Sequence, residues 1–227
     1  MATVILVRHG RSTANTSGVL AGRATGITLD ETGEQQAARV AERLAAIPLV
    51  GVVSSPLERC RLTARAILER QEGGLELMTE PDVIECDYGE WEGQEIKDLA
   101  KQDLWTLVQT QPSSARFPGG ESLAEMQHRT VAAVRRLDAA FEAEHGTSAV
   151  WALVSHGDPI KSVLADALGM HLDLFQRLDV HPGSASVVRH GTQRPAVIAV
   201  NTAEGDLGWL ASKPEESDAR VGGGDAS

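Results

Sequence analysis

The stretch Leu6-Val7-Arg8-His9-Gly10-Arg11-Ser12 ends an apolar run that begins at Val4. The run predicts a buried strand over residues 3–7, and the end of that strand delivers an arginine and a histidine. Open α/β sheets bind ligands at the carboxyl ends of their strands, so both side chains are placed for a ligand site. Arginine offers a rigid fork of donors for phosphate, and histidine offers a base or nucleophile near neutral pH. Taken alone, the stretch is compatible with a metal site, a general base or a phosphate clamp.

A second apolar run, Val150 to Val154, ends in Ser155-His156-Gly157. Two strands that each end in His-Gly predict one site built from both. The glycine after each histidine lets a backbone or a ligand approach closely. We interpret the other histidines as ordinary polar residues: His128, His145, His171, His181 and His190.

Alternating strand and helix patterns predict an α/β fold. Strands are expected at residues 3–7, 50–54, 75–78, 149–154, 184–189 and 196–200, with helices between them. We expect a single three-layer α/β/α domain over residues 1–211, in which helices cover both faces of a mostly parallel central sheet. Residues 212–227 are rich in Glu, Ser, Asp and Gly, and we expect them to form a disordered tail.

The composition limits the kinds of molecule that the protein is expected to bind. The 227 residues include 42% hydrophobic residues and carry a formal net charge of −11. This charge argues against nucleic-acid binding but not against an anionic substrate, since local cations outweigh a distant net charge. No signal peptide and no apolar window of ~18 residues is found, so we expect a cytoplasmic protein that does not cross a membrane. Cys60 and Cys86 have no metal-type spacing and are expected to be reduced thiols.

The segment Ser54-Ser55-Pro56-Leu57-Glu58-Arg59-Cys60 predicts a helix that starts directly after a strand. Ser55 is expected to cap this helix, with Glu58 three residues later as in a capping box. Arg59 would then lie in the first turn, where the helix terminus and a guanidinium group both favour phosphate. A surface arginine paired with Glu58 or Glu69 is the alternative interpretation.

Acidic residues crowd positions 85–95: Glu85, Asp87, Glu90, Glu92 and Glu95. For most of them we expect a solvated acidic loop. One carboxyl group near two histidines would have a raised pKa and serve as a proton donor. Periodicity does not identify which of the carboxyl groups this is.

Four ordered motifs together resemble the histidine phosphatase superfamily, the phosphoglycerate-mutase-like group. They are Arg8-His9-Gly10 with Asn15, the segment from Ser54 to Cys60, Glu85-x-x-x-Gly89-x-Trp91-x-Gly93, and Ser155-His156-Gly157. The motifs occur in the family's order and spacing and cover about residues 3–200.

The resemblance implies a role for each motif residue. His9 would be the nucleophile that becomes phosphohistidine, and Glu85 would be the general acid and then the base that activates water. Arg8, Arg59 and His156 would form the phosphate pocket, without any metal or cofactor. The implied contacts to phosphate or substrate are Asn15, Gly22, Arg23 and Gly157.

This assignment agrees with the chemistry of phosphoryl transfer. The transferred group carries negative charge on three equatorial oxygens, so fixed cations stabilise it. Arg8, Arg59 and a protonated His156 would supply up to three positive charges. His9 must be unprotonated at its attacking nitrogen, so we expect a hydrogen bond at its other nitrogen that fixes the tautomer.

The interval from Gln94 to Gly120 is where the mutases of the family differ from its phosphatases. Glycolytic mutases of the family carry an extra segment there, with paired arginines that hold a second phosphate or carboxylate. Here the only cations of that interval are Lys97, Lys101 and Arg116. The resemblance therefore favours a phosphomonoesterase that acts on small phosphorylated metabolites. A phosphoglycerate mutase-type phosphomutase is the alternative, and an inactive phosphate-ligand-binding regulatory protein is a third hypothesis.

The substrate beyond its phosphate is less defined by the sequence. Candidates for an apolar pocket wall, or for ordinary core packing in at least two cases, are Trp91, Trp105, Leu107 and Phe117. Arg11 and Arg23 are candidate contacts for a second anionic group. A homodimer is compatible with the resemblance, since dimers are common among related folds.

Overall fold

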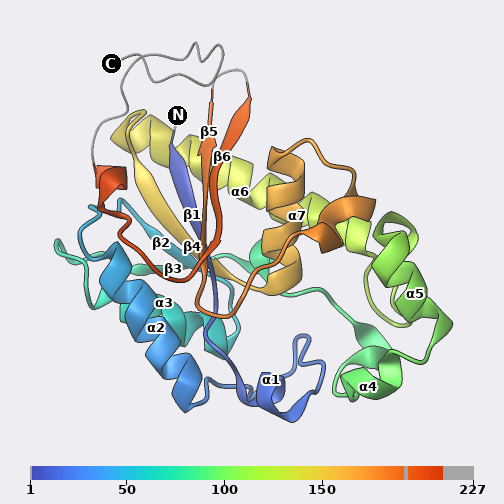
Figure 1. Cartoon of the computed structure of the whole chain (residues 1–227). Helices are drawn as coiled ribbons and strands as arrows, with labels where there is room; N and C mark the ends of the chain where they lie inside the picture. Colours follow the sequence, from blue (N-terminus) through green and yellow to red (C-terminus); the bar gives the residue numbers. More distant parts are fainter. Residues whose placement is uncertain (1, 192–193, 212–227) are drawn as a thin grey trace.

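The computed structural model describes residues 2–191 and 194–211, and within them six strands form one sheet (Figure 1). The strands are β1 (Thr3–Arg8), β2 (Val52–Ser54), β3 (Leu77–Thr79), β4 (Val150–Ser155), β5 (Ala185–His190) and β6 (Pro195–Thr202). Their order is β3-β2-β4-β1-β5-β6. The first four strands in this order are parallel to one another. At the other edge, β5 is antiparallel to β1, and β6 is antiparallel to β5. The predicted, mostly parallel sheet is confirmed, with its antiparallel strands gathered at one edge.

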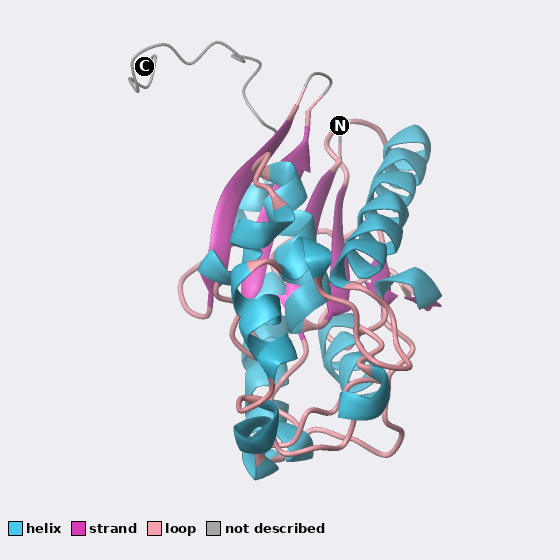
Figure 2. Cartoon of the chain, turned by 90° about the vertical axis from the view of Figure 1, so that its right-hand side faces the viewer, coloured by secondary structure: helices cyan, strands magenta, loops and turns pink. Residues whose placement is uncertain are grey.

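Helices cover both faces of this sheet, as the edge-on view in Figure 2 shows. On one face, α2 (Glu31–Leu44) and α3 (Glu58–Leu68) share an apolar core with Ile5 and Val7 of β1. On the other face, α6 (Leu123–His145) and α7 (Gly157–Ala167) share a core with Val4 and Leu6. Successive side chains of a strand point to opposite faces, so this fully buried run serves both cores. The α/β/α layering expected from the sequence is therefore confirmed.

A third apolar cluster lies beside α6 and α7 and organises the segments beyond the carboxyl ends of the strands. Its largest members are Tyr88, Trp91, Phe117, Met126 and Phe175. It supports α4 (Ile96–Leu99) and α5 (Asp103–Thr110), while α1 (Thr13–Ser17) lies on the other side of the same end of the sheet (Figure 1). Short 3-10 helices complete the described chain at Pro81–Val83, Gly89–Trp91, Pro112–Ser114, Leu172–Arg177 and Gly208–Ala211.

Two helices begin with side-chain caps, whereas the start expected at Ser55 is displaced. Asp30 Oδ1 accepts the amide of Gly33 at 2.8 Å at the start of α2, and Ser122 forms a capping box with Glu125 at the start of α6. In contrast, α3 is capped by Leu57 without any side-chain hydrogen bond, so it begins later than the capping-box pattern predicts. The reason is that the hydroxyl of Ser55 binds another partner, described below.

The expected tail, residues 212–227, lies outside the described residues. Across residues 2–191 and 194–211, no helix is both long enough and apolar enough to cross a lipid bilayer.

Candidate functional site

Three neighbouring parallel strands bring the predicted residues to one edge of the sheet. Arg8 is opposite Ser155 in the pairing of β1 with β4, so these two strands end at the same level. His9 follows β1, Ser55 follows β2 and His156 follows β4. Residues that are far apart in sequence are therefore neighbours at the carboxyl ends of the strands, as expected for ligand sites of open α/β sheets.

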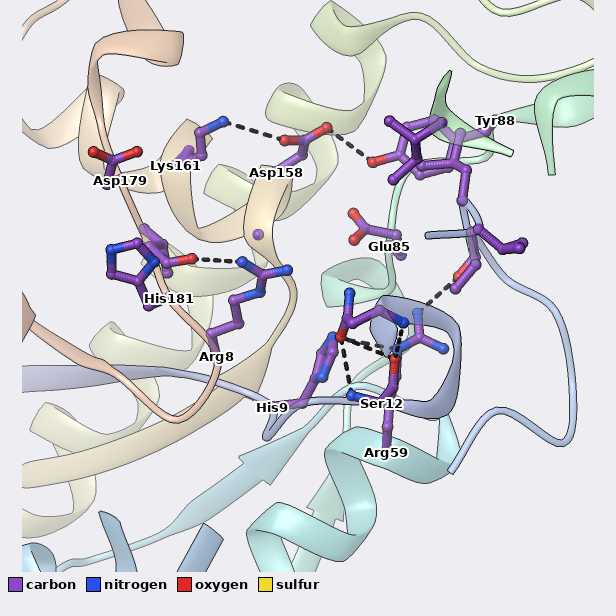
Figure 3. Close-up of a pocket in the computed structure, with 18 of the residues that line it drawn as sticks. Arg8, His9, Ser12, Arg59, Glu85, Tyr88, Asp158, Lys161, Asp179 and His181 are labelled. Atoms are coloured by element: carbon purple, nitrogen blue, oxygen red, sulfur yellow. Dashed lines mark hydrogen bonds and ion pairs between the residues drawn. The ribbon is translucent and has the colours of Figure 1, made fainter. Parts of the chain in front are cut away.

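A cavity of about 290 Å³ opens at this edge (Figure 3). Four of the five core residues expected from the sequence line it, namely Arg8, His9, Arg59 and Glu85. Of the expected phosphate or substrate contacts, those that line it are Asn15, Gly22 and Gly157. The structure thus gathers most of the predicted site around one small space.

His9 is held in a single tautomer. Its Nδ1 lies 2.7 Å from the carbonyl oxygen of Gly10, and because a carbonyl only accepts, Nδ1 carries the proton. Nε2 therefore presents a lone pair, which accepts a hydrogen bond from Nε of Arg59 at 3.3 Å. Burial, together with the charges of Arg59 and Arg8, holds the pKa of His9 well below its ordinary value. The expected hydrogen bond that fixes the tautomer is present, and the imidazole is neutral.

Arg59 connects the two histidines. Its Nη2 donates to the carbonyl of Gly22 at 2.8 Å and to Nδ1 of His156 at 3.3 Å, while its Nε donates to His9. Among the described residues, Nη1 of Arg59 and Nε of Arg8 are buried and have no hydrogen-bond partner. Buried donors in native proteins are normally paired, and guanidinium groups pair best with carboxylate or phosphate oxygens. These two donors are therefore suited to an oxyanion.

His156 differs from its predicted charge state. Arg59 can only donate, so Nδ1 of His156 accepts, and its Nε2 carries the proton donated to the hydroxyl of Ser55 at 2.7 Å. Burial first, and then the neighbouring charge of Arg59, hold its pKa well below the ordinary value. The prediction that a protonated His156 supplies a third positive charge is therefore wrong for this environment. The ring is fully buried, 5.2 Å from that of His9 between centroids, and it is not among the residues that line the cavity.

Glu85 is the carboxyl group that the sequence motif singled out, and its surroundings favour the protonated form. Its Oε1 accepts the amide of Cys86 at 2.9 Å. Its backbone carbonyl accepts hydrogen bonds from Arg23 at 2.9 Å and from Arg129 at 3.0 Å, which fix the main chain here. Burial, and then the negative charge of Asp158, raise the pKa of Glu85 to about 7. A carboxyl group with this pKa can both give and take a proton near neutral pH.

Arg23 supports the backbone of Glu85 and is not among the residues that line the cavity, so its contact with substrate stays a prediction. Its guanidinium group pairs with Glu121 at 2.8 Å and with Asp87 at 3.3 Å. Glu121 also pairs with Arg129 at 2.6 Å, so one carboxylate holds both arginines that anchor the Glu85 backbone. The charge of Arg23 is thus engaged by carboxylates. Arg129 and Glu121 were missed in the sequence because neither lies in a motif, and only the fold brings them to Glu85.

The apolar wall of the cavity is made by other residues than those expected. The four aromatic and aliphatic candidates pack in or against the third apolar cluster: Trp91, Trp105, Leu107 and Phe117. The apolar lining residues are instead Val19, Leu20, Ile96, Leu178 and Val180. Two loops are paired to form part of this wall, because Leu20 donates to the carbonyl of Gln94 and Ile96 to that of Gly18, each at 2.9 Å. No periodic pattern marks these residues, so they could not be identified before the fold was known.

A polar group that the sequence interpretation missed lines the cavity on the side away from Arg59 (Figure 3). Its members are Asp158, Lys161, Asp179 and His181. Asp158 and Lys161 are one helical turn apart directly after the His156-Gly157 motif, and that spacing was an available signal. His181 was interpreted as an ordinary polar residue, and the structure places it at the cavity instead. Within the described chain, no cluster of three His, Cys, Asp or Glu side chains is arranged to hold a metal ion.

Comparison with known proteins agrees with this arrangement. The family model described as "Histidine phosphatase superfamily (branch 1)" matches residues 4–203. The "Phosphoserine phosphatase 1" of Hydrogenobacter thermophilus is 31% identical over 207 residues, which cover 88% of this chain and 92% of that protein. The "Probable phosphoglycerate mutase GpmB" of Yersinia enterocolitica is 32% identical over 190 residues, covering 83% and 85%. A solved mycobacterial glucosyl-3-phosphoglycerate phosphatase has a TM-score of 0.79 at 23% identity, covering 88% and 98%, and shares the fold.

Proposed function

The chain belongs to branch 1 of the histidine phosphatase superfamily, and from that premise we propose that it is a metal-independent phosphomonoesterase. The proposed substrates are small phosphorylated metabolites, and the proposed intermediate is a phosphohistidine on His9. One observation carries the proposal: Arg8 and Arg59 line the cavity that contains His9, and each has a buried donor without a hydrogen-bond partner. We propose residues 1–211 as the catalytic domain.

In the first step, Nε2 of His9 attacks phosphorus, so that a P–N bond forms while the ester P–O bond breaks. The proton of Glu85 passes to the leaving oxygen, and the alcohol departs as a neutral molecule. Arg8 and Arg59 stabilise the charge on the equatorial oxygens, the largest contribution expected of a protein to phosphoryl transfer.

In the second step, water attacks phosphorus and its proton passes to Glu85, which the first step left ionised. The new P–O bond forms as the P–N bond breaks, and inorganic phosphate is released. His9 returns to the neutral form, and its Nδ1–H donates to the Gly10 carbonyl throughout. Asn15 and Gly22 line the same cavity and are the proposed further contacts to phosphate or substrate.

Water is the favoured acceptor because the site offers few free cations for a second anionic group. Lys161, the lysine of the cavity, lies 3.6 Å from a carboxylate oxygen of Asp158. Arg11, a candidate for a second anion, pairs with Asp30 at 2.7 Å and is not among the lining residues. A bisphosphorylated intermediate would also meet the exposed carboxylate of Asp179. Mutase activity is kept as the alternative because several relatives carry that name.

The proposal is tested by hydrolysis of an aryl phosphate in the presence of EDTA. Wild-type protein is expected to release phosphate and to form an acid-labile phosphohistidine, and His9→Ala is expected to do neither while keeping its circular dichroism and Tm. His128→Ala, an exposed histidine on α6, is the matched control and should remain active. Efficient interconversion of 3- and 2-phosphoglycerate without hydrolysis would contradict a phosphatase and support the mutase. Inactivity in both assays would support a phosphate-ligand-binding protein.

A further inference from the structure

Asp158 is a second carboxylate in the cavity that contains Glu85. It lies in the first turn of α7, and its Oδ2 accepts a hydrogen bond from the hydroxyl of Tyr88 at 2.9 Å. Its Oδ1 lies 3.6 Å from Nζ of Lys161. Figure 3 shows the carboxyl group of Glu85 in the space between this Asp158–Tyr88 pair and the guanidinium group of Arg8. The motifs that identify the family do not assign any role to Asp158.

We propose that Asp158 is a positioning residue of the reaction: its carboxylate, held by Tyr88 and Lys161, keeps the catalytic proton on Glu85 until the leaving oxygen takes it. The inference rests on the proposed phosphatase function and adds to it the residue that controls the general acid.

The hydrogen bonds decide which of the two carboxyl groups holds the proton. Two carboxylates in one largely buried cavity repel each other, so one of them favours the neutral form. The carboxyl group of Asp158 accepts the phenol hydroxyl of Tyr88 and lies near the ammonium group of Lys161. The carboxyl group of Glu85 accepts the amide of Cys86, and its arginine neighbours Arg23 and Arg129 donate to its backbone carbonyl instead. Donors thus hold the side chain of Asp158, whereas the two arginines bonded to Glu85 contact its backbone, and this difference favours the proton on Glu85.

Charged and titratable groups of several elements line the cavity with Glu85 or contact its backbone. They are Arg8 of β1, Arg59 of α3, Arg129 of α6, Asp158 and Lys161 of α7, Asp179 and His181 of the loop before β5, Arg23 of the loop after α1, and the hydroxyl of Tyr88. Arg8 and Arg59 favour the ionised carboxylate of Glu85, whereas burial and Asp158 oppose it. Without the charge of Asp158, the two arginines would face less opposition and Glu85 would lose its proton at a lower pH.

Lys161 holds Asp158 without cancelling its charge. Its Nζ is closer to Oε1 of Gln176, at 2.6 Å, than to Asp158. It also lies over the ring of Phe175, 4.7 Å from the centroid, so this cation–π contact shares the ammonium group with Asp158. The negative charge of Asp158 therefore still acts on Glu85. Removal of Lys161 would strengthen this electrostatic effect.

The proton balance of the two steps follows from this arrangement. As the ester P–O bond breaks, the Glu85 proton passes to the leaving oxygen, and two carboxylates then stand in the same cavity. Their repulsion makes Glu85 the better base for the proton of the attacking water in the second step. The proton taken from water restores the starting state, so no other acid or base is consumed.

The test compares the pH dependence of kcat/KM in Asp158→Asn and Lys161→Gln, with an alkyl phosphate and an aryl phosphate as substrates. The fall of kcat/KM at high pH, the high-pH limb of the profile, reports loss of the Glu85 proton when the alkyl ester is the substrate. Only the alkyl leaving group needs that proton. Asp158→Asn should move this limb to lower pH by about one unit, the usual size of a nearby-charge effect. Lys161→Gln should move it in the opposite direction. A structural disturbance alone would not give shifts of opposite sign.

Asp166→Asn is the matched control, because Asp166 lies on the same helix and pairs with Arg135 at 2.8 Å, outside the cavity. Its limb should coincide with that of the wild type. An unmoved limb in both Asp158→Asn and Lys161→Gln overturns the inference. A loss of alkyl-ester hydrolysis in Asp158→Asn that is as large as in Glu85→Gln at every pH would make Asp158 itself the proton donor and also overturn it. A wild-type protein that hydrolyses neither ester contradicts the proposed function instead.

Discussion

Nε of Arg59 lies 3.3 Å from Nε2 of His9, so the guanidinium group donates directly to the lone pair of the proposed nucleophile. The same side chain reaches His156 and the carbonyl of Gly22, and both histidines accept from it. One arginine therefore fixes the orientation of two imidazole rings, and burial together with its charge lowers the pKa of both. A phosphoryl group that reaches His9 replaces the imidazole lone pair as the acceptor of this donor.

Arg59→Lys should lower kcat/KM for an aryl phosphate by about 10²–10³-fold, the usual cost of losing one electrostatic donor. The positive charge is kept, but an ammonium group cannot donate to His9, His156 and phosphate in a fixed fork. Arg61→Lys, an exposed position on the same helix, should keep wild-type activity in the same steady-state assay. Equal activity of the two variants would mean that charge alone, not the fork geometry, supports the reaction.

Glu85→Gln should slow hydrolysis of alkyl phosphates by about 10²–10⁴-fold, the range of general acid catalysis, and affect aryl phosphates far less. An alkoxide leaving group needs a proton, whereas a phenolate does not. The comparison requires kcat/KM for both esters, with the exposed Glu90→Gln as the control. Equal losses for the two esters would instead assign Glu85 a purely positional role.

Glu85 should also make the free energy of unfolding depend on pH. Its folded pKa is raised from 4.5 to about 7, so its contribution to stability is present below the unfolded value and is lost as the pH rises through 7. Glu85→Gln keeps a neutral side chain at every pH. It should therefore be more stable than the wild type at about pH 8, by up to roughly 3 kcal/mol, and no more stable at about pH 4. Urea unfolding at the two pH values measures this, and a pH-independent difference would contradict it.

Tungstate or vanadate should bind in the cavity and compete with substrate, because the unpartnered donors of Arg8 and Arg59 suit a tetrahedral oxyanion. Binding to the folded state alone raises stability by about 2.7 kcal/mol when the ligand is at 100 times its Kd. A rise in Tm with tungstate is therefore expected for the wild type and should be much smaller for Arg59→Lys. Inhibition that does not compete with substrate would place the oxyanion elsewhere.

Ser55→Ala should reduce kcat, because the proton on Nε2 of His156 loses its acceptor and the tautomer is no longer fixed. An unpaired buried donor also costs about 1–3 kcal/mol of stability. Ser54→Ala is the control, since Ser54 is equally buried but donates to the carbonyl of Ser55 at 2.8 Å. If Ser54→Ala and Ser55→Ala lose kcat to the same extent, the loss comes from packing and not from His156.

The parts of the fold and site that could be predicted are those encoded by neighbours in sequence. The buried run from Val4 to Val7 marked β1 and placed Arg8 and His9 at its end, and the capping box at Ser122 marked the start of α6. Arg59 and Glu85 needed the resemblance, because no local pattern separates them from other charged residues of their segments.

The parts that could not be predicted depend on partners that are distant in sequence. Ser55 has the local preference of a helix cap, but its hydroxyl binds His156, which is 101 positions away, and the start of α3 is displaced. The charge state of His156 depends on burial beside Arg59. Arg23 lies in a loop that suggested substrate contact, yet the fold brings Glu121 to its guanidinium group.

The paired loops at the cavity mouth have a consequence for protein engineering. Leu20 and Ile96 contribute to the wall, whereas Arg8 and His9 lie at the end of a core strand. The residues that would contact the variable part of a substrate thus lie in segments that take no part in the pairing of the sheet. Replacing segments 18–20 and 93–96 together with those of a relative should change the substrate specificity while the reacting groups keep their positions. Grafting one segment alone would break the backbone pairing between them.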